Sequence, residues 1–217
     1  VTVDPTGRFL YASNEDSQDI TSYRIQDGLF VEGPFEAIAP GNPQELRFLA
    51  RGDRAYSAMA DSNILVPYSV DPLTGALTPI PPGRGTGARP EAIELHPSGR
   101  WAYVAVSDSG SGSGHVAFYN VVQATGSLQG QVQVFPGLNP VDLRVEPRGR
   151  FLYVLNQGGD DLAIVAVNIF EVWGQFTGTA RRDAFLARKD PPFHVVGDGE
   201  KVAALFEGVT RIPTLLV

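Results

Sequence analysis

Residues 147–153 read Pro-Arg-Gly-Arg-Phe-Leu-Tyr, and they repeat residues 5–11, which read Pro-Thr-Gly-Arg-Phe-Leu-Tyr, with one change. Related stretches surround Gly52, Gly99 and, in its weakest form, Gly199. From the first copy to the last, the glycines are spaced 45, 47, 50 and 50 residues apart. A period of this size is typical of a propeller blade made of four short strands. The stretch therefore predicts an all-β fold built from repeats of one unit.

Each repeat carries the same order of short segments. A proline opens an alternating run such as residues 141–145, and a turn follows in which glycine supplies the positive φ of a tight hairpin. Next comes a run rich in aromatic and branched residues, such as residues 151–155, and then a polar turn and a third run. A glycine-containing turn leads into a fourth. Four such strands make one antiparallel blade, and no segment shows a convincing helical period.

Five repeats divide the chain within a single propeller domain. Their approximate bounds are residues 1–40, 41–87, 88–137, 138–189 and 190–217. The first repeat begins inside an inner strand and the last ends near a third strand, so we expect truncation of a larger ring at both ends. A closed ring of five blades is the alternative, because propellers of about four to eight blades exist. An open ring leaves unpaired strand edges, which predicts strand sharing with another chain.

The composition is that of an ordinary globular protein. Hydrophobic residues make up 43% of the chain and the net charge is −7. An acidic chain without a cluster of Lys or Arg argues against nucleic acid as a partner. No apolar run approaches the roughly 18 residues of a membrane-spanning helix. The lack of cysteine excludes disulfides but does not fix the compartment, where an extracellular or periplasmic location is slightly favoured over the cytoplasm.

The repeats resemble the lactonase-type seven-bladed β-propeller family and its relatives, the YVTN-repeat propellers. The segments that carry the resemblance are residues 3–14, 69–78, 96–104 and 146–156. The resemblance covers almost the whole chain and implies a seven-bladed ring, which needs roughly 330 residues at this period. It is specific for architecture, because the same repeat serves enzymes, surface proteins and passive scaffolds.

For an enzyme of this family, the resemblance implies His, Arg and Glu side chains at one mouth of the central channel. Lactone hydrolysis needs a polarising cation and a carboxylate or imidazole that activates water. Glu15 follows an asparagine after the second strand of repeat one, as the family pattern requires. Arg89 precedes the proline that opens repeat three, and His194 follows the prolines that open repeat five. No repeat has the full set, so Glu15, Arg89 and His194 are the catalytic candidates if the chain is an enzyme.

The other polar residues and the aromatic residues have structural explanations. The turn carboxylates fit Asx turns better than a calcium loop, so neither a metal nor a cofactor is predicted. We expect His96 to be exposed before its turn, and His115 follows a Ser/Gly-rich loop unsuited to a catalytic triad. The aromatic residues that recur after each turn glycine are expected to pack between blades.

Two functions remain open from the sequence. The degenerate polar positions and the missing ring segments favour a non-catalytic binding or structural propeller. Such a propeller would present its loop faces to a protein, or to a small-molecule or sugar ligand. The alternative is a lactonase-like hydrolase that acts on a sugar lactone, of the 6-phosphogluconolactonase type, or a related cyclase. The sequence alone leans away from an enzyme.

Overall fold

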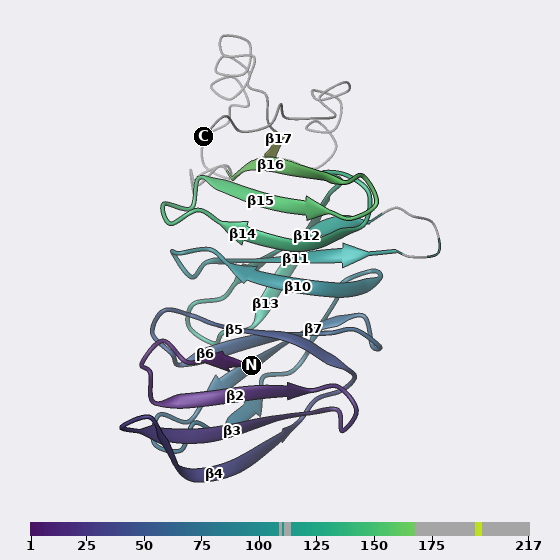
Figure 1. Cartoon of the computed structure of the whole chain (residues 1–217). Coiled ribbons are helices and arrows are strands. Elements are labelled where there is room, and N and C mark those ends of the chain that lie inside the picture. The colour runs from purple at the N-terminus through teal and green to yellow at the C-terminus, as the bar shows by residue number, and fades with distance from the viewer. Residues whose placement is uncertain (109, 111–113, 168–193, 197–217) are drawn as a thin grey trace.

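The computed structural model describes residues 1–108, 110, 114–167 and 194–196. Within these ranges the chain forms four sheets that follow one another in sequence order and stack side by side (Figure 1). No helix occurs in them, and hence none long and apolar enough to cross a membrane. The predicted all-β fold of four-stranded propeller blades is confirmed for this part of the chain.

Each sheet is formed by strands that are consecutive in the chain. The first sheet contains β1 (Thr2–Val3), β2 (Phe9–Asn14), β3 (Asp19–Gln26) and β4 (Leu29–Ile38). The second contains β5 (Pro43–Phe48), β6 (Arg54–Met59), β7 (Ile64–Val70) and β8 (Leu77–Pro79), with β9 (Arg84–Gly85) also paired to β7. The third contains β10 (Arg89–Leu95), β11 (Trp101–Ser107), β12 (His115–Val121) and β13 (Leu128–Val134). The fourth contains β14 (Pro140–Val145), β15 (Phe151–Asn156), β16 (Asp161–Val167) and β17 (His194–Val196).

The fourth sheet differs from the others in its outermost strand. In the first three sheets all neighbouring strands are antiparallel, whereas β17 pairs in parallel with β16. The sequence predicted an antiparallel outer strand here from within residues 168–189, which lie outside the described residues. The turn expected around Gly199 also lies outside them.

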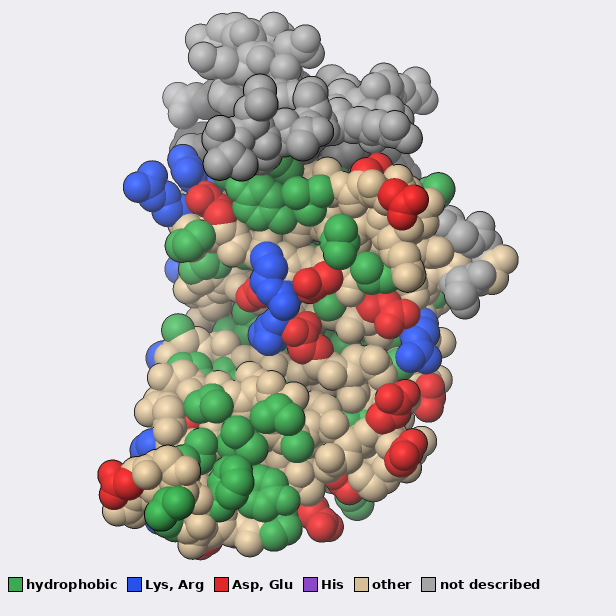
Figure 2. Space-filling model, in the orientation of Figure 1, with side chains coloured by type: hydrophobic (Ala, Val, Ile, Leu, Met, Phe, Trp, Pro, Cys, Tyr) green, Lys and Arg blue, Asp and Glu red, His purple; other side chains and the backbone are tan. Residues whose placement is uncertain are grey.

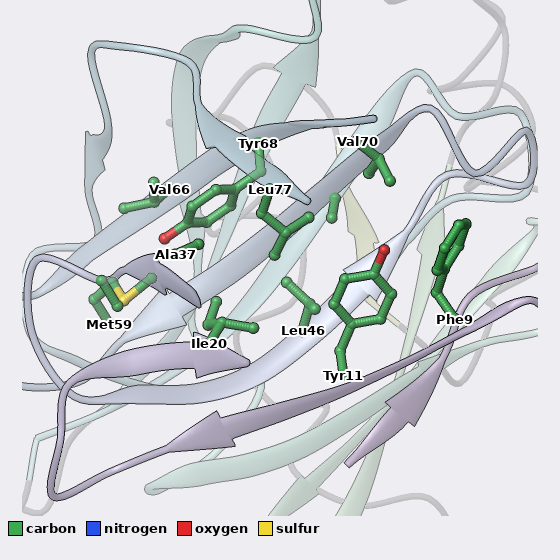
Figure 3. Packing of buried hydrophobic residues seen from close by; sticks show 12 residues of the cluster. Phe9, Tyr11, Ile20, Ala37, Leu46, Met59, Val66, Tyr68, Val70 and Leu77 are labelled. Carbon is green, nitrogen blue, oxygen red and sulfur yellow. The ribbon is translucent and has the colours of Figure 1, made fainter. Parts of the chain in front are cut away.

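The core lies between successive sheets rather than inside any one of them. Three clusters of buried side chains occur, one at each contact between neighbouring sheets. Figure 3 shows the first cluster, in which Leu46 and Leu77 of the second sheet lie between Tyr11 of β2 and Tyr68 of β7. The equivalent tyrosines of the next two repeats, Tyr56 and Tyr103, are also fully buried. The prediction that the recurring aromatic residues pack between blades is confirmed for the tyrosines of the first three repeats, whereas Tyr153 of the fourth is half-buried and belongs to none of the three clusters.

His96 corrects one expectation from the sequence. It was expected to be exposed, but its side chain is only 5% exposed because it packs against the turn of the following blade. Its Nε2 donates a hydrogen bond to the carbonyl oxygen of Gly149 at 2.9 Å, and its Nδ1 lies 2.7 Å from the Ser98 hydroxyl. His115 is buried too, and its Nε2 donates to the Thr86 carbonyl at 2.9 Å. Both histidines therefore join separate segments of the propeller.

Candidate active site

The innermost strand of each sheet contributes to one shared surface. These strands are β1, β5, β10 and β14, and the last three lie next to one another in the fold (Figure 1). Pro43 and Pro140 begin β5 and β14, and Pro90 is the second residue of β10; the pairing with the second strand shifts just after each proline. Proline has no N–H to donate to a ladder, and such a bulge re-aims the side chains that follow it.

Beyond the bulge, apolar and charged side chains alternate along each inner strand. Leu46, Ile93 and Leu143 enter the core clusters between the sheets. Successive side chains on a strand point to opposite faces, so the charged neighbours of these three residues lie on the face that points away from these clusters. The inner strands therefore present a polar surface.

Five charged residues of this surface form one ion-pair network. Its members are Glu45, Arg47, Glu94, Asp142 and Arg144. Arg47 contacts Glu45 on its own strand and lies 3.9 Å from Glu94. Arg144 lies 2.7 Å from Asp142 and 3.8 Å from both Glu45 and Glu94. Acidic and basic side chains gather on this face in Figure 2, and the network joins the second, third and fourth sheets.

Two carboxylates of the network are held by backbone as well as by arginine. Glu45 accepts a hydrogen bond from the Ile93 N–H at 2.9 Å, which ties β5 to β10. Glu94 accepts one from the Leu95 N–H at 3.1 Å. Burial raises the pKa of Glu94 above its usual value, and the nearby Glu45 adds to the rise while Arg47 and Arg144 oppose it. A carboxyl group perturbed in this way beside two cations is typical of functional sites.

The inner strands surround a hollow of about 390 Å³, within the size range of small-molecule sites. Every one of the four inner strands lines it, and the charged lining residues are Glu45, Arg47, Glu91, Asp142 and Arg144. Glu94 does not line the hollow, but it contacts both arginines that do. The arrangement places cations and carboxylates side by side at a cavity large enough for a sugar-sized molecule.

The structure places the three candidates from the sequence at different points. Glu15 follows β2, where its carboxylate accepts a hydrogen bond from Asn42 at 2.6 Å. Arg89 begins β10 and lies 3.2 Å from Glu91 and 3.8 Å from Asp61. Each of these two residues thus joins the start of an inner strand to the polar turn of the preceding blade.

His194 lies apart from both of them. It begins β17, and its backbone pairs with Val165 at the outer edge of the fourth sheet. The sequence placed it on the inner strand of a fifth repeat, so the observed position differs. The structure therefore does not bring Glu15, Arg89 and His194 together in one cluster.

The inner-strand network was missed from the sequence, although a signal for it exists. Arg47, Glu94 and Arg144 each stand four residues after the proline that opens their repeat. A charged side chain at one fixed position of otherwise alternating strands indicates a shared polar surface. In the described ranges, no group of three or more His, Cys, Asp or Glu side chains is arranged to hold a metal ion.

Repeated four-stranded sheets define a β-propeller, and its inner strands line one polar hollow, which is the candidate site. The chain belongs to the lactonase family of seven-bladed β-propellers. The family model described as "Lactonase, 7-bladed beta-propeller" matches residues 1–82 and 78–171. This confirms the family resemblance that the repeats carry.

Several known proteins are similar to this chain. The 6-phosphogluconolactonase of Bacillus subtilis (strain 168) is 24% identical over 168 residues, which are 74% of this chain and 47% of that protein. The periplasmic gluconolactonase PpgL of Pseudomonas aeruginosa has a similar structure, with a TM-score of 0.65, 24% identity, and coverage of 77% of this chain and 49% of that one. A Bacteroides fragilis protein provisionally described as a 6-phosphogluconolactonase has a TM-score of 0.68 at 20% identity, with coverage of 77% and 50%.

These relatives correct the functional expectation from the sequence. The non-catalytic binding or structural propeller was favoured there, but the similar proteins are named as lactonases, which supports the alternative. The degenerate polar positions around Glu15, Arg89 and His194 and the missing ring segments favoured the non-catalytic propeller, but neither feature describes the inner strands. The chain spans about half the length of the relatives that it matches.

Proposed function

We propose that this chain is part of a lactonase that hydrolyses a sugar lactone, and that the hollow between the inner strands holds the substrate. The observation that carries the proposal is the pairing of Arg47 and Arg144 with carboxylates around that hollow. Lactone hydrolysis needs both kinds of group at one place, and the names of the similar proteins support the same reaction.

Arg144 is the group best suited to polarise the lactone carbonyl. It lines the hollow and its side chain is 50% exposed, so a bound molecule has access to its guanidinium. When water adds to the carbonyl carbon, negative charge develops on the carbonyl oxygen. A fixed guanidinium stabilises that charge more than it stabilises the neutral ester.

Glu45 is the group that we assign to activate water. It lines the hollow, and the Ile93 N–H and the neighbouring arginines fix its orientation. Its carboxylate takes a proton from water while the oxygen bonds to the carbonyl carbon. The ring C–O bond then breaks, and the proton returns to the departing oxygen to give the hydroxy acid.

The experiment is a rate measurement on the full-length protein with glucono-1,5-lactone, corrected for spontaneous hydrolysis. Replacement Arg144→Ala should lower kcat/KM by about 10²- to 10³-fold, because it removes the group that stabilises the oxyanion. Glu45→Gln should lower kcat by at least about 10²-fold while keeping the acceptor for the Ile93 N–H.

A matched control is available on the first sheet. Arg24 is paired with Glu32 at 3.5 Å, is about as exposed as Arg144, and does not line the hollow. Arg24→Ala should therefore leave the rate within about twofold of the original protein, because a distant surface ion pair contributes little. Equal activity in Arg24→Ala and Arg144→Ala would rule out the assigned site.

A further inference from the structure

We infer that the site prefers a lactone without a phosphate or other anionic group, an inference that rests on the proposed function. The first observation is the charge of the hollow. Glu45, Glu91 and Asp142 line it, against Arg47 and Arg144, so its described lining carries more negative than positive charge. A cleft whose lining is negative lowers the local concentration of an anionic substrate and leaves that of a neutral one unchanged.

The second observation is that both arginines already have carboxylate partners. Arg47 is shared between Glu45 and Glu94. Arg144 is shared among the same two residues and Asp142, which lies 2.7 Å away. Phosphate recognition commonly uses a guanidinium whose donors are free to form paired hydrogen bonds. A phosphate held by paired hydrogen bonds would have to displace carboxylates that the backbone holds in place, whereas a single carbonyl oxygen needs only one donor from the half-exposed side chain of Arg144.

Arg89, the cation next to the network, also has carboxylate partners. Arg89 lies 3.2 Å from Glu91 and 3.8 Å from Asp61, so each positive charge at this end of the described structure faces at least one negative charge. Uncharged sugar hydroxyls suit such a surface. Each hydroxyl can donate to a carboxylate oxygen and accept from a guanidinium N–H without bringing a net charge.

The test compares kcat/KM of the full-length protein for glucono-1,5-lactone and for its 6-phosphorylated form. At low ionic strength, about 10 mM, the uncharged lactone should be favoured at least about tenfold. The preference should shrink at about 0.5 M salt, where charge repulsion is screened. A preference for the phosphorylated lactone would overturn the inference and leave the lactonase proposal standing. Hydrolysis of neither lactone would overturn both.

Charge-neutralising variants give a second readout that does not depend on the absolute rate. Asp142→Asn and Glu91→Gln each remove one negative charge from the hollow. Asn at 142 can still accept from the Leu143 N–H, and Gln at 91 can still accept from the Ser107 hydroxyl. Each should raise the ratio of phosphorylated to uncharged kcat/KM about three- to tenfold.

Glu32→Gln is the matched control for these variants. Glu32 lies on β4, is paired with Arg24 and does not line the hollow, so the ratio should stay the same. An unchanged ratio in Asp142→Asn and Glu91→Gln would overturn the inference, provided that both variants melt cooperatively near the temperature of the original protein.

Discussion

Gly149 forms the turn between β14 and β15 with a φ of +72°, a conformation that residues with a Cβ atom rarely adopt. A Cβ at this position would lie 2.1 Å from Nε2 of His96, in the place where the neighbouring blade packs. Gly7 forms the equivalent turn of the first repeat with a φ of +70°, but a Cβ there would meet no atom within 4 Å. The two glycines thus share a backbone strain and differ in their surroundings.

We therefore predict that Gly149→Ala destabilises the protein more than Gly7→Ala does. Both variants should lose about 1–2 kcal/mol from the backbone conformation. Gly149→Ala should lose at least about 1 kcal/mol more, because His96 must leave its hydrogen bond to the turn. The measurement is denaturant unfolding of the full-length protein. Equal losses in the two variants would contradict the role of His96 as a contact between blades.

The sequence predicted single residues well where one repeat could be compared with another. It identified the turn glycines and the buried tyrosines, because each recurs at a fixed position. It could not predict the burial of His96, since that depends on the turn of the next blade. The roles of Glu15 and Arg89 stay predictions, although their contacts are now defined.

At the scale of the strand, the tyrosines connect each blade to the next. Tyr11 on β2 donates a hydrogen bond to the carbonyl of Gly75, in the turn between β7 and β8, at 2.8 Å. Tyr56 on β6 donates in the same way to Gly126 at 2.8 Å. Tyr68 on β7 is equally buried in the first cluster, but its hydroxyl has no hydrogen-bond partner among the described residues. The hydroxyl groups of Tyr11 and Tyr68 therefore contribute differently to stability.

Removal of each hydroxyl tests this difference. Tyr11→Phe should lower the free energy of unfolding by about 1–2 kcal/mol, because it leaves the Gly75 carbonyl without its buried donor. Tyr68→Phe should change it by less than about 0.5 kcal/mol or stabilise the protein, since an unpaired buried hydroxyl is lost. The two variants are compared by thermal and denaturant unfolding. A larger loss for Tyr68→Phe would contradict the hydrogen-bond assignment.

The sequence also predicted most of the strands, but it did not predict how the inner strands contact one another. Alternation and turn residues depend on neighbouring positions and can be read locally. The contacts of Arg144 with Glu45 and Glu94 join residues from three repeats, and no local pattern specifies them. The parallel pairing of β17 with β16 was missed for the same reason.

At the scale of the whole molecule, the candidate site depends on several blades together rather than on any single blade. The ion-pair network spans three sheets, and the hollow is lined by inner strands of all four. The repeat period therefore predicted the architecture, but it could not choose between a binding propeller and an enzyme. Strand sharing with another chain stays a prediction.

The measurement that tests the central claim most directly is a crystal structure of the full-length protein with gluconolactam, an unreactive analogue of the lactone. We expect the analogue in the hollow between β1, β5, β10 and β14, with its carbonyl oxygen within about 3 Å of the Arg144 guanidinium. The neighbouring Glu45 carboxylate should face its carbonyl carbon through a water molecule. An analogue bound at another part of the propeller, with this hollow empty, would contradict the assignment of the inner-strand network as the active site.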